Sequence, residues 1–175
     1  MTLYRPCHLH DEWVTLTEEE YSEAVEHGRS LWAESQADAR IRDRWRRIPG
    51  GVDGERVQVI GSIAECAGAK ALGVVWPKRR GNFKGPDLDP NIEVRLIGVN
   101  SYGLRISPRD VDSRRVVAVV IPRGTERSYY RLPGWINAKH GKRAEWLMDP
   151  HGRGQPIYAV PQDRLHPLSL LRDLI

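Results

Sequence analysis

The feature that most restricts the fold of this chain is the near-continuous apolar run at residues 115–121, with Val-Val-Ala-Val-Val at its centre. A strand with one face in water alternates polar and apolar residues, so an unbroken run indicates a strand buried on both faces. Such a strand lies in the middle of a sheet, and other elements must cover both faces of that sheet. A chain of 175 residues is long enough for one domain of this kind.

Two helices are predicted before this strand. Thr17-Glu18-Glu19-Glu20 has the form of a capping box, and apolar residues then recur at helical spacing, so a helix is expected from residue 17 to about residue 47. A second helix is expected over residues 55–72, with Gly73 placed to end it. This second helix is rich in Gly, Ala and Ser, which permits close packing against a sheet.

The remaining pattern predicts short strands and turns. Residues 1–16 read as irregular, and residues 133–136 read as a turn. Strands are expected at residues 92–97, 104–106, 129–132 and 157–160, and helical turns at residues 144–147 and 167–171. The order predicts a mixed α/β (α+β) domain with one central sheet flanked by helices.

Several classes of protein have no support in the sequence. No apolar run approaches the ~20 residues that span a bilayer, so no membrane association is expected. Cys7 and Cys66 give no disulfide framework, which favours a cytoplasmic protein. His8 and His10 beside Cys7 lack a second ligand pair for zinc, and neither a Gly-x-Ser-x-Gly elbow nor a phosphate-binding Gly-Lys-Ser/Thr loop is present.

Three acidic residues stand out by their positions. Glu65 lies in the helix rich in small residues, Asp87 follows Gly85-Pro86, and Glu93 lies in the strand at residues 92–97. Alternation in that strand places Glu93 and Arg95 on one face. Taken singly, they read as a solvated helix residue, a turn former and half of a surface ion pair. Carboxylates that converge repel one another unless a cation lies between them, and their oxygens suit Mg²⁺ or Mn²⁺.

The order of these residues resembles a known nuclease signature. Gly85-Pro86-Asp87 followed by Ile92-Glu93-Val94-Arg95 is similar to the motif of the PD-(D/E)XK nuclease superfamily, with Arg95 where that family usually has lysine. The helix with Glu65 matches an acidic position found in many members. The later strands resemble those of phage and restriction-type members. The resemblance implies a single restriction-endonuclease-like domain, with an N-terminal helical extension (1–50), a core with the metal site (55–136) and a C-terminal completion (137–175).

The resemblance also implies an activity, a metal-dependent hydrolysis of phosphodiester bonds in DNA. Asp87 and Glu93 would bind Mg²⁺ or Mn²⁺, Glu65 would complete the site, and Arg95 would act at the lysine position. Lys78, Arg79, Arg80 and Lys84 form a basic loop just upstream that is expected to contact the DNA backbone. A phage or a bacterial mobile or defence system is the expected source. The formal net charge of +4 is compatible with a polyanionic partner.

Two alternatives stay open at this point. Arginine remains protonated and cannot act as a general base, so Arg95 also suits a catalytically inactive nuclease-like module that binds nucleic acid or a protein. A structural protein that dimerises through the helix at residues 17–47 is the other alternative, and a nuclease could form the same homodimer. Trp76 is expected either to pack in the core or to stack on a base.

Overall fold

The computed structural model describes residues 10–37, 53–79, 85–98, 103–121, 129–150, 152 and 154–175. Its elements are, in chain order, β1 (Glu12–Val14), α1 (Glu18–Ala37), α3 (Gly54–Leu72), β2 (Ile92–Ile97), β3 (Leu104–Ile106), β4 (Arg115–Val120), β5 (Tyr130–Asn137), α4 (Ala138–Gly141), η1 (Ala144–Trp146), β6 (Leu147–Met148), β7 (Ile157–Val160), η2 (Gln162–Arg164) and α5 (Leu168–Arg172). Within the described residues, the strands form a four-stranded sheet in the order β1-β5-β4-β2 and a three-stranded sheet in the order β3-β7-β6. The expectation of a single sheet is therefore wrong.

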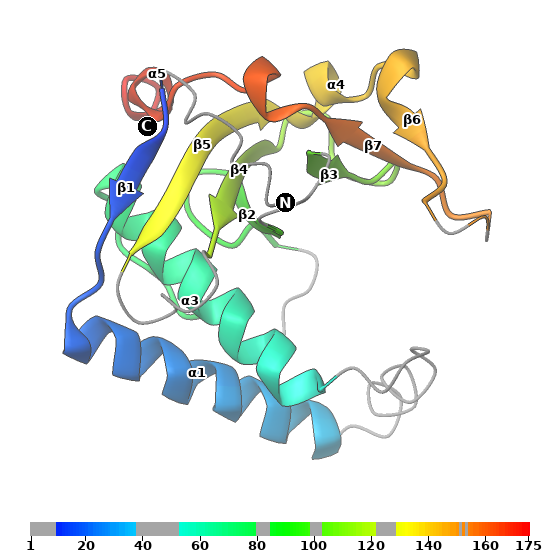
Figure 1. Ribbon diagram of the computed structural model, residues 1–175. Helices are drawn as coiled ribbons and strands as arrows, with labels where there is room; N and C mark the ends of the chain where they lie inside the picture. Colours follow the sequence, from blue (N-terminus) through cyan, green and yellow to red (C-terminus); the bar gives the residue numbers. More distant parts are fainter. Residues whose placement is uncertain are drawn as a thin grey trace, which may run out of the picture.

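Strand β4 is the centre of the fold, as its apolar run predicts. It lies between β5 and β2, antiparallel to β5 and parallel to β2. Val117 and Val119 pack in the core under α3 and α5, whereas Val116, Ala118 and Val120 pack against the three-stranded sheet. Figure 1 shows α3 and α1 on one side of the four-stranded sheet and β3, β7 and β6 on the other. The unbroken apolar run exists because both faces of β4 are covered.

The two long helices begin and end where local signals place them. The capping box is confirmed, since the Thr17 amide donates to Glu20 Oε2 (2.7 Å) and the Glu20 amide donates to Thr17 Oγ1 (3.2 Å). Helix α3 is capped by Asp53, which accepts from the Arg56 amide, and it ends at Gly73 with φ +71°. Helix α1 ends at Ala37, and the expected continuation through residues 40–47 lies outside the described residues.

The helices pack closely because one of them offers a glycine at the crossing. A Cβ on Gly28 of α1 would lie 2.5 Å from Val59 Cα of α3, so no larger residue fits without separating them. The face of α1 that carries Ala24 and Gly28 is thus occupied by α3 of the same chain. A homodimer through α1 stays a prediction, and it would need a different face of this helix.

Two further expectations are wrong. The segment before Leu16 contains the short strand β1, which pairs with β5 through residues such as Trp13 opposite Arg131. The turn expected at residues 133–136 is instead part of β5, which continues to Asn137. Gly134 adopts φ +139°, and Trp135 exchanges backbone hydrogen bonds with His166 (2.9 and 2.8 Å). The Pro-Gly pair therefore bends the strand locally while pairing holds it in the sheet.

The coarse expectation of a mixed α/β fold with a mixed sheet flanked by helices is confirmed. No helix within the described residues combines the length and apolar character that crossing a membrane requires.

Candidate functional site

The candidate site lies at the open edge of the four-stranded sheet, where β2 pairs only with β4 among the described strands. Val94 points toward α3, since a Cβ on Gly68 of that helix would lie 3.1 Å from Val94 Cγ2. Glu93 and Arg95 take the alternate positions of β2, and their side chains are partly buried. Because β2 is the edge strand, side chains from α3 can approach side chains of β2 around the edge of the sheet.

Asp87 is fixed beside this edge by the backbone. The segment before β2 folds back through an isolated bridge between Leu88 and Ile92. The Val94 amide donates to Asp87 Oδ2 (2.8 Å), which holds the carboxylate against β2. Burial, together with repulsion by Glu93, raises the pKa of Asp87 to about 6, although the Val94 amide opposes this change.

Glu65 approaches from α3. Trp76 Nε1 donates to Glu65 Oε2 (3.3 Å), so the carboxylate is held by the segment that follows the helix. Burial raises the pKa of Glu65 to about 7, and repulsion by Asp87 and Glu93 adds to this effect. Repulsion of this kind falls with distance, so the three carboxylates predicted from the sequence lie in one neighbourhood.

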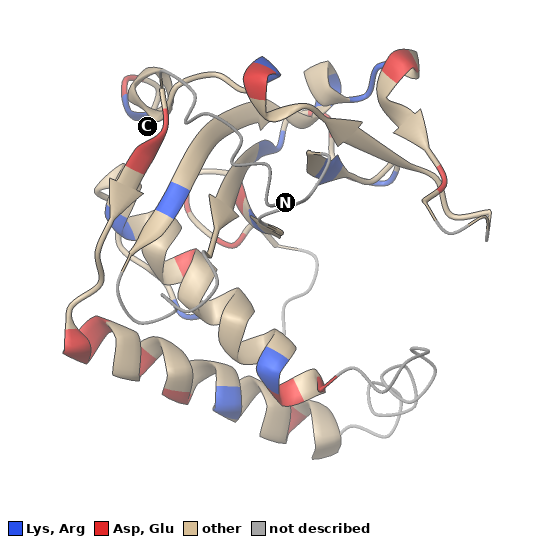
Figure 2. Ribbon diagram, in the orientation of Figure 1, with Lys and Arg blue, Asp and Glu red and all other residues tan. Residues whose placement is uncertain are grey.

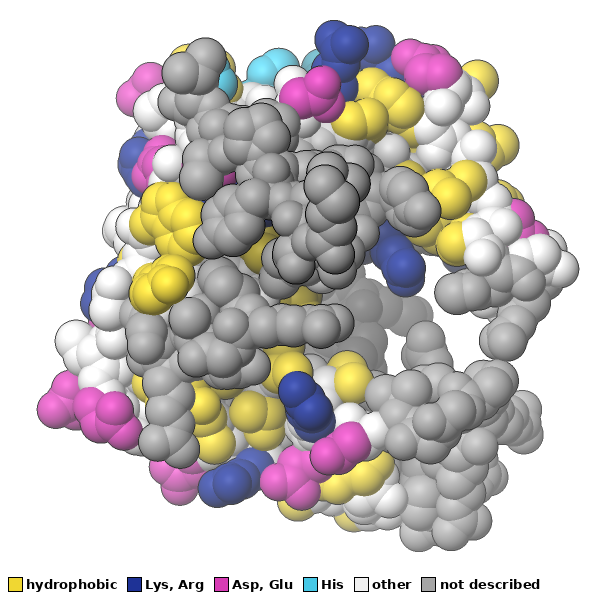
Figure 3. Space-filling view, viewed as in Figure 1, with side chains coloured by type: hydrophobic (Ala, Val, Ile, Leu, Met, Phe, Trp, Pro, Cys, Tyr) yellow, Lys and Arg dark blue, Asp and Glu magenta, His cyan; other side chains and the backbone are white. Residues whose placement is uncertain are grey.

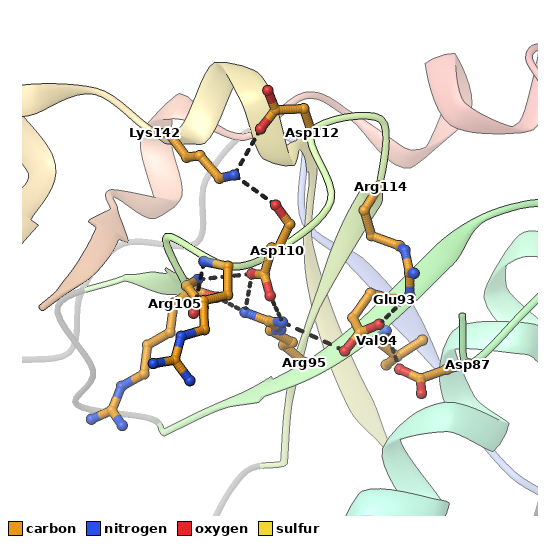
Figure 4. A network of polar contacts seen from close by, with 11 residues as sticks. Asp87, Glu93, Val94, Arg95, Arg105, Asp110, Asp112, Arg114 and Lys142 are labelled. Carbon is orange, nitrogen blue, oxygen red and sulfur yellow. Dashed lines mark hydrogen bonds and ion pairs between the residues drawn. The ribbon is translucent and has the colours of Figure 1, made fainter. Parts of the chain in front are cut away.

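Glu93 differs from the other two carboxylates because arginines already bind it. Arg114 Nη1 donates to Glu93 Oε2 (2.7 Å) and to the Gly85 carbonyl (3.2 Å), and its side chain is 11% exposed. Arg95 Nη2 is further away, at 3.5 Å from Glu93 Oε1. Figure 4 shows Glu93 between Arg114 and Arg95, with Asp87 nearby.

Arg95 is held mainly by the turn after β3. Its Nη1 lies 2.8 Å from Asp110 Oδ2 and donates to the Arg105 carbonyl (2.7 Å), while Nη2 donates to Asp110 Oδ1 (2.9 Å). Asp110 also accepts from the Ser107 amide (2.7 Å), and its carbonyl accepts from Lys142 Nζ (2.6 Å). These contacts raise the pKa of Arg95 against the opposing effect of burial, so this side chain is a fixed cation.

The donor chemistry fits a magnesium ion only in part. Among the residues that the structure describes, no group of three or more His, Cys, Asp or Glu side chains is arranged to hold a metal ion. Glu93 is turned to its arginines, which leaves Asp87 and Glu65 as oxygen donors. Mg²⁺ keeps several waters and is often bound through one or two carboxylates. The raised pKa values of Asp87 and Glu65 are those of carboxylates that a cation would stabilise in the charged form.

The cations of the predicted basic loop are less available for DNA binding than the sequence suggests. Lys78 forms an ion pair with Glu23, and Arg79 forms one with Asp89 (2.6 Å). Arg80 and Lys84 lie outside the described residues. Trp76 packs against the hydrophobic core and makes an edge-on contact with His27 at 5.2 Å between ring centroids, as the core interpretation of this residue expects.

Arg114 is the site residue that sequence reasoning misses. In the sequence, Arg114 is simply the first of two arginines before a buried strand. It reaches Glu93 because β2 and β4 pair in parallel, with Ile92 opposite Arg115. Asp110 follows β3, and no local pattern in the sequence predicts its contact with Arg95. Comparisons of the chain with protein-family models, with curated proteins and with solved structures found no match.

Proposed function

We propose that this protein is a metal-dependent DNA nuclease that hydrolyses phosphodiester bonds. Asp87 and Glu65 would bind Mg²⁺ or Mn²⁺ directly, and Glu93, which its arginines hold, would complete the site as the sequence predicts only by turning toward the metal. The observation that supports this proposal most is the gathering of three carboxylates from three separate segments, two of which have raised pKa values. Glu65 and Asp87 destabilise the fold when both are charged, and a bound cation would relieve that cost. The proposal includes a restriction-endonuclease-like core, a phage or bacterial mobile or defence-system origin, and a cytoplasmic location.

Arg114 and Arg95 have different roles in this proposal. A bound Mg²⁺ would supply water activation and stabilisation of the charge that grows on the scissile phosphate. Arg114 holds Glu93 through the 2.7 Å contact and so orients its carboxylate. Arg95 stays protonated and cannot act as a base, and its terminal nitrogens already bind Asp110, the Arg105 carbonyl and Glu93. It would therefore hold Glu93 and add positive charge near the scissile phosphate without clamping it.

Cleavage assays with purified protein test the proposal. Linear, circular, branched and single-stranded DNA are incubated with Mg²⁺, Mn²⁺ or EDTA. We expect metal-dependent cleavage that Asp87→Asn and Glu65→Gln abolish and that Asp163→Asn, an exposed acidic residue on η2, leaves intact. Absence of cleavage on all substrates, or cleavage that survives Asp87→Asn, contradicts the proposal.

The competing proposal is a nuclease-like module that binds DNA without cutting it. The observation in its favour is that Arg114 and Arg95 already neutralise Glu93. This module would bind DNA in EDTA, with a salt dependence set by its cations, and Asp87→Asn would not weaken that binding. Metal-dependent cleavage by the wild-type protein rejects this second proposal.

A further inference from the structure

Two arginines beside the candidate site are exposed and have no carboxylate partner among the described residues. Arg105 is the middle residue of β3, exposed between Leu104 and Ile106, which are fully buried. Arg109 is exposed in the turn that follows β3. Figure 2 shows Lys and Arg residues on β3 and around α4, whereas α1 carries mainly acidic residues.

The backbone that carries these two arginines is tied to the site. Arg95 donates to the carbonyl of Arg105 (2.7 Å), which fixes β3 beside β2. The Ser107 amide donates to Asp110 (2.7 Å), and the Arg109 amide donates to Ser107 Oγ (3.2 Å), which closes the turn. In Figure 4 the Arg105 side chain extends away from the pair formed by Arg95 and Asp110. The Arg105 and Arg109 side chains are therefore carried by a backbone held at a set position beside Arg95 and Asp110.

Three other cations nearby are paired with carboxylates. Lys142 contacts Asp112 (2.7 Å), Arg114 contacts Glu93, and Arg79 contacts Asp89. Arg105 and Arg109 thus contribute uncompensated positive charge on the β3 side of an acidic site. Figure 3 shows exposed Lys and Arg side chains near a hollow of this face. Guanidinium groups bind phosphate oxygens in bidentate geometry, and uncompensated cations supply most of the affinity for a nucleic acid backbone.

We infer that Arg105 and Arg109 form a phosphate-binding strip that holds the backbone of duplex DNA next to the acidic site. This inference rests on the proposed function, because it takes DNA as the ligand. It differs from the sequence expectation, in which the loop with Lys78 and Arg79 contacts the DNA. The strip carries no base recognition, so its contribution is equal for all sequences.

Binding without metal tests the strip separately from catalysis. The affinity for a short fluorescent DNA duplex is measured by anisotropy in EDTA at salt concentrations from about 50 to about 200 mM. Each phosphate contact contributes about 0.9 to the slope of log affinity against log salt. Arg105→Ala should reduce the slope by about 0.9, and the variant with both arginines changed should reduce it by about 1.8. Over this fourfold range of salt, the wild type should then lose about 12-fold more affinity than the double variant.

A matched control separates the strip from general charge effects. Arg164→Ala removes an exposed arginine on η2, an element attached to β5 through the contact of Gln162 with Arg131, two strands from β2. This variant should leave the slope unchanged. All three arginines are exposed, so thermal unfolding should not differ among these variants.

The outcomes distinguish the strip from the nuclease proposal. Equal slopes for the wild type, Arg105→Ala and the double variant overturn the strip, as does a wild-type protein that binds no duplex at the lowest salt. Reduced slopes support the strip even if the wild type cleaves no DNA, in which case only the nuclease proposal fails. If the wild type cleaves DNA with metal and the arginine variants keep the wild-type slope, only the strip is rejected.

Discussion

Replacing Glu65 with glutamine should stabilise the metal-free protein at alkaline pH. The pKa of Glu65 is raised from 4.5 to about 7, so the folded protein retains a proton that the unfolded chain releases in this range. The free energy of unfolding therefore falls as pH rises from about 4.5 to about 7. Each pH unit in that interval costs about 1.4 kcal/mol, which gives about 3 kcal/mol at pH 8. Glutamine resembles the protonated acid, can accept from Trp76 Nε1, and carries no such cost.

Urea unfolding at pH 4 and pH 8 in EDTA measures this difference. Glu65→Gln should raise the free energy of unfolding by about 3 kcal/mol at pH 8 and by almost nothing at pH 4. Glu26→Gln, which changes an exposed glutamate on α1, is the matched control and should have little effect at either pH. Added Mg²⁺ should stabilise the wild type more than Glu65→Gln at pH 8. Equal stability of Glu65→Gln and wild type at pH 8 would refute the burial and repulsion on which the site rests.

Two further predictions concern packing and the arginine missed in the sequence. Gly28→Ala should destabilise the protein by about 2–3 kcal/mol because its Cβ would meet Val59 Cα at 2.5 Å, whereas Gly61→Ala on α3, with open space around it, should stabilise by about 0.5–1 kcal/mol. Chemical denaturation of both variants checks this pair, and similar effects of the two would contradict the close crossing of α1 and α3. Arg114→Ala should lower the rate of DNA cleavage by about 10–100-fold, because it removes the contact that orients Glu93. Arg115→Ala is its control in the same assay. An equal loss of cleavage rate in both variants would refute the role of Arg114 in orienting Glu93.

Local signals in the sequence predict much of the fold. The capping box at Thr17, the C-terminal Gly73 and the unbroken apolar run each act through neighbouring residues, so they can be read without the tertiary structure. β5 is mispredicted because Pro133-Gly134 normally turns the chain, and here backbone pairing of Trp135 with His166 holds it extended. The second sheet is missed because β3 pairs with β7 more than fifty positions away, as Leu104 does with Val160, and because β6 is only two residues long.

The same distinction applies to the site. Glu65, Asp87 and Glu93 are predicted because their order along the chain resembles a known motif, and in the structure they lie near enough to repel one another. Arg114 reaches Glu93 only through the register of two parallel strands, which no local pattern encodes. The sequence also does not show whether a cation is free to bind a ligand. Lys78, for example, forms an ion pair with Glu23 in the structure.

Calorimetric titration of the protein with Mn²⁺ is the most direct test of the central proposal, that the acidic site with Asp87 and Glu65 beside Glu93 binds a divalent metal ion. We expect saturable binding that weakens about tenfold or more in Asp87→Asn and that is unchanged in Asp163→Asn. We also expect the affinity to fall as pH decreases through about 7 and then about 6, where Glu65 and Asp87 take up protons. No binding at pH 8, or binding that Asp87→Asn leaves intact, would contradict the account.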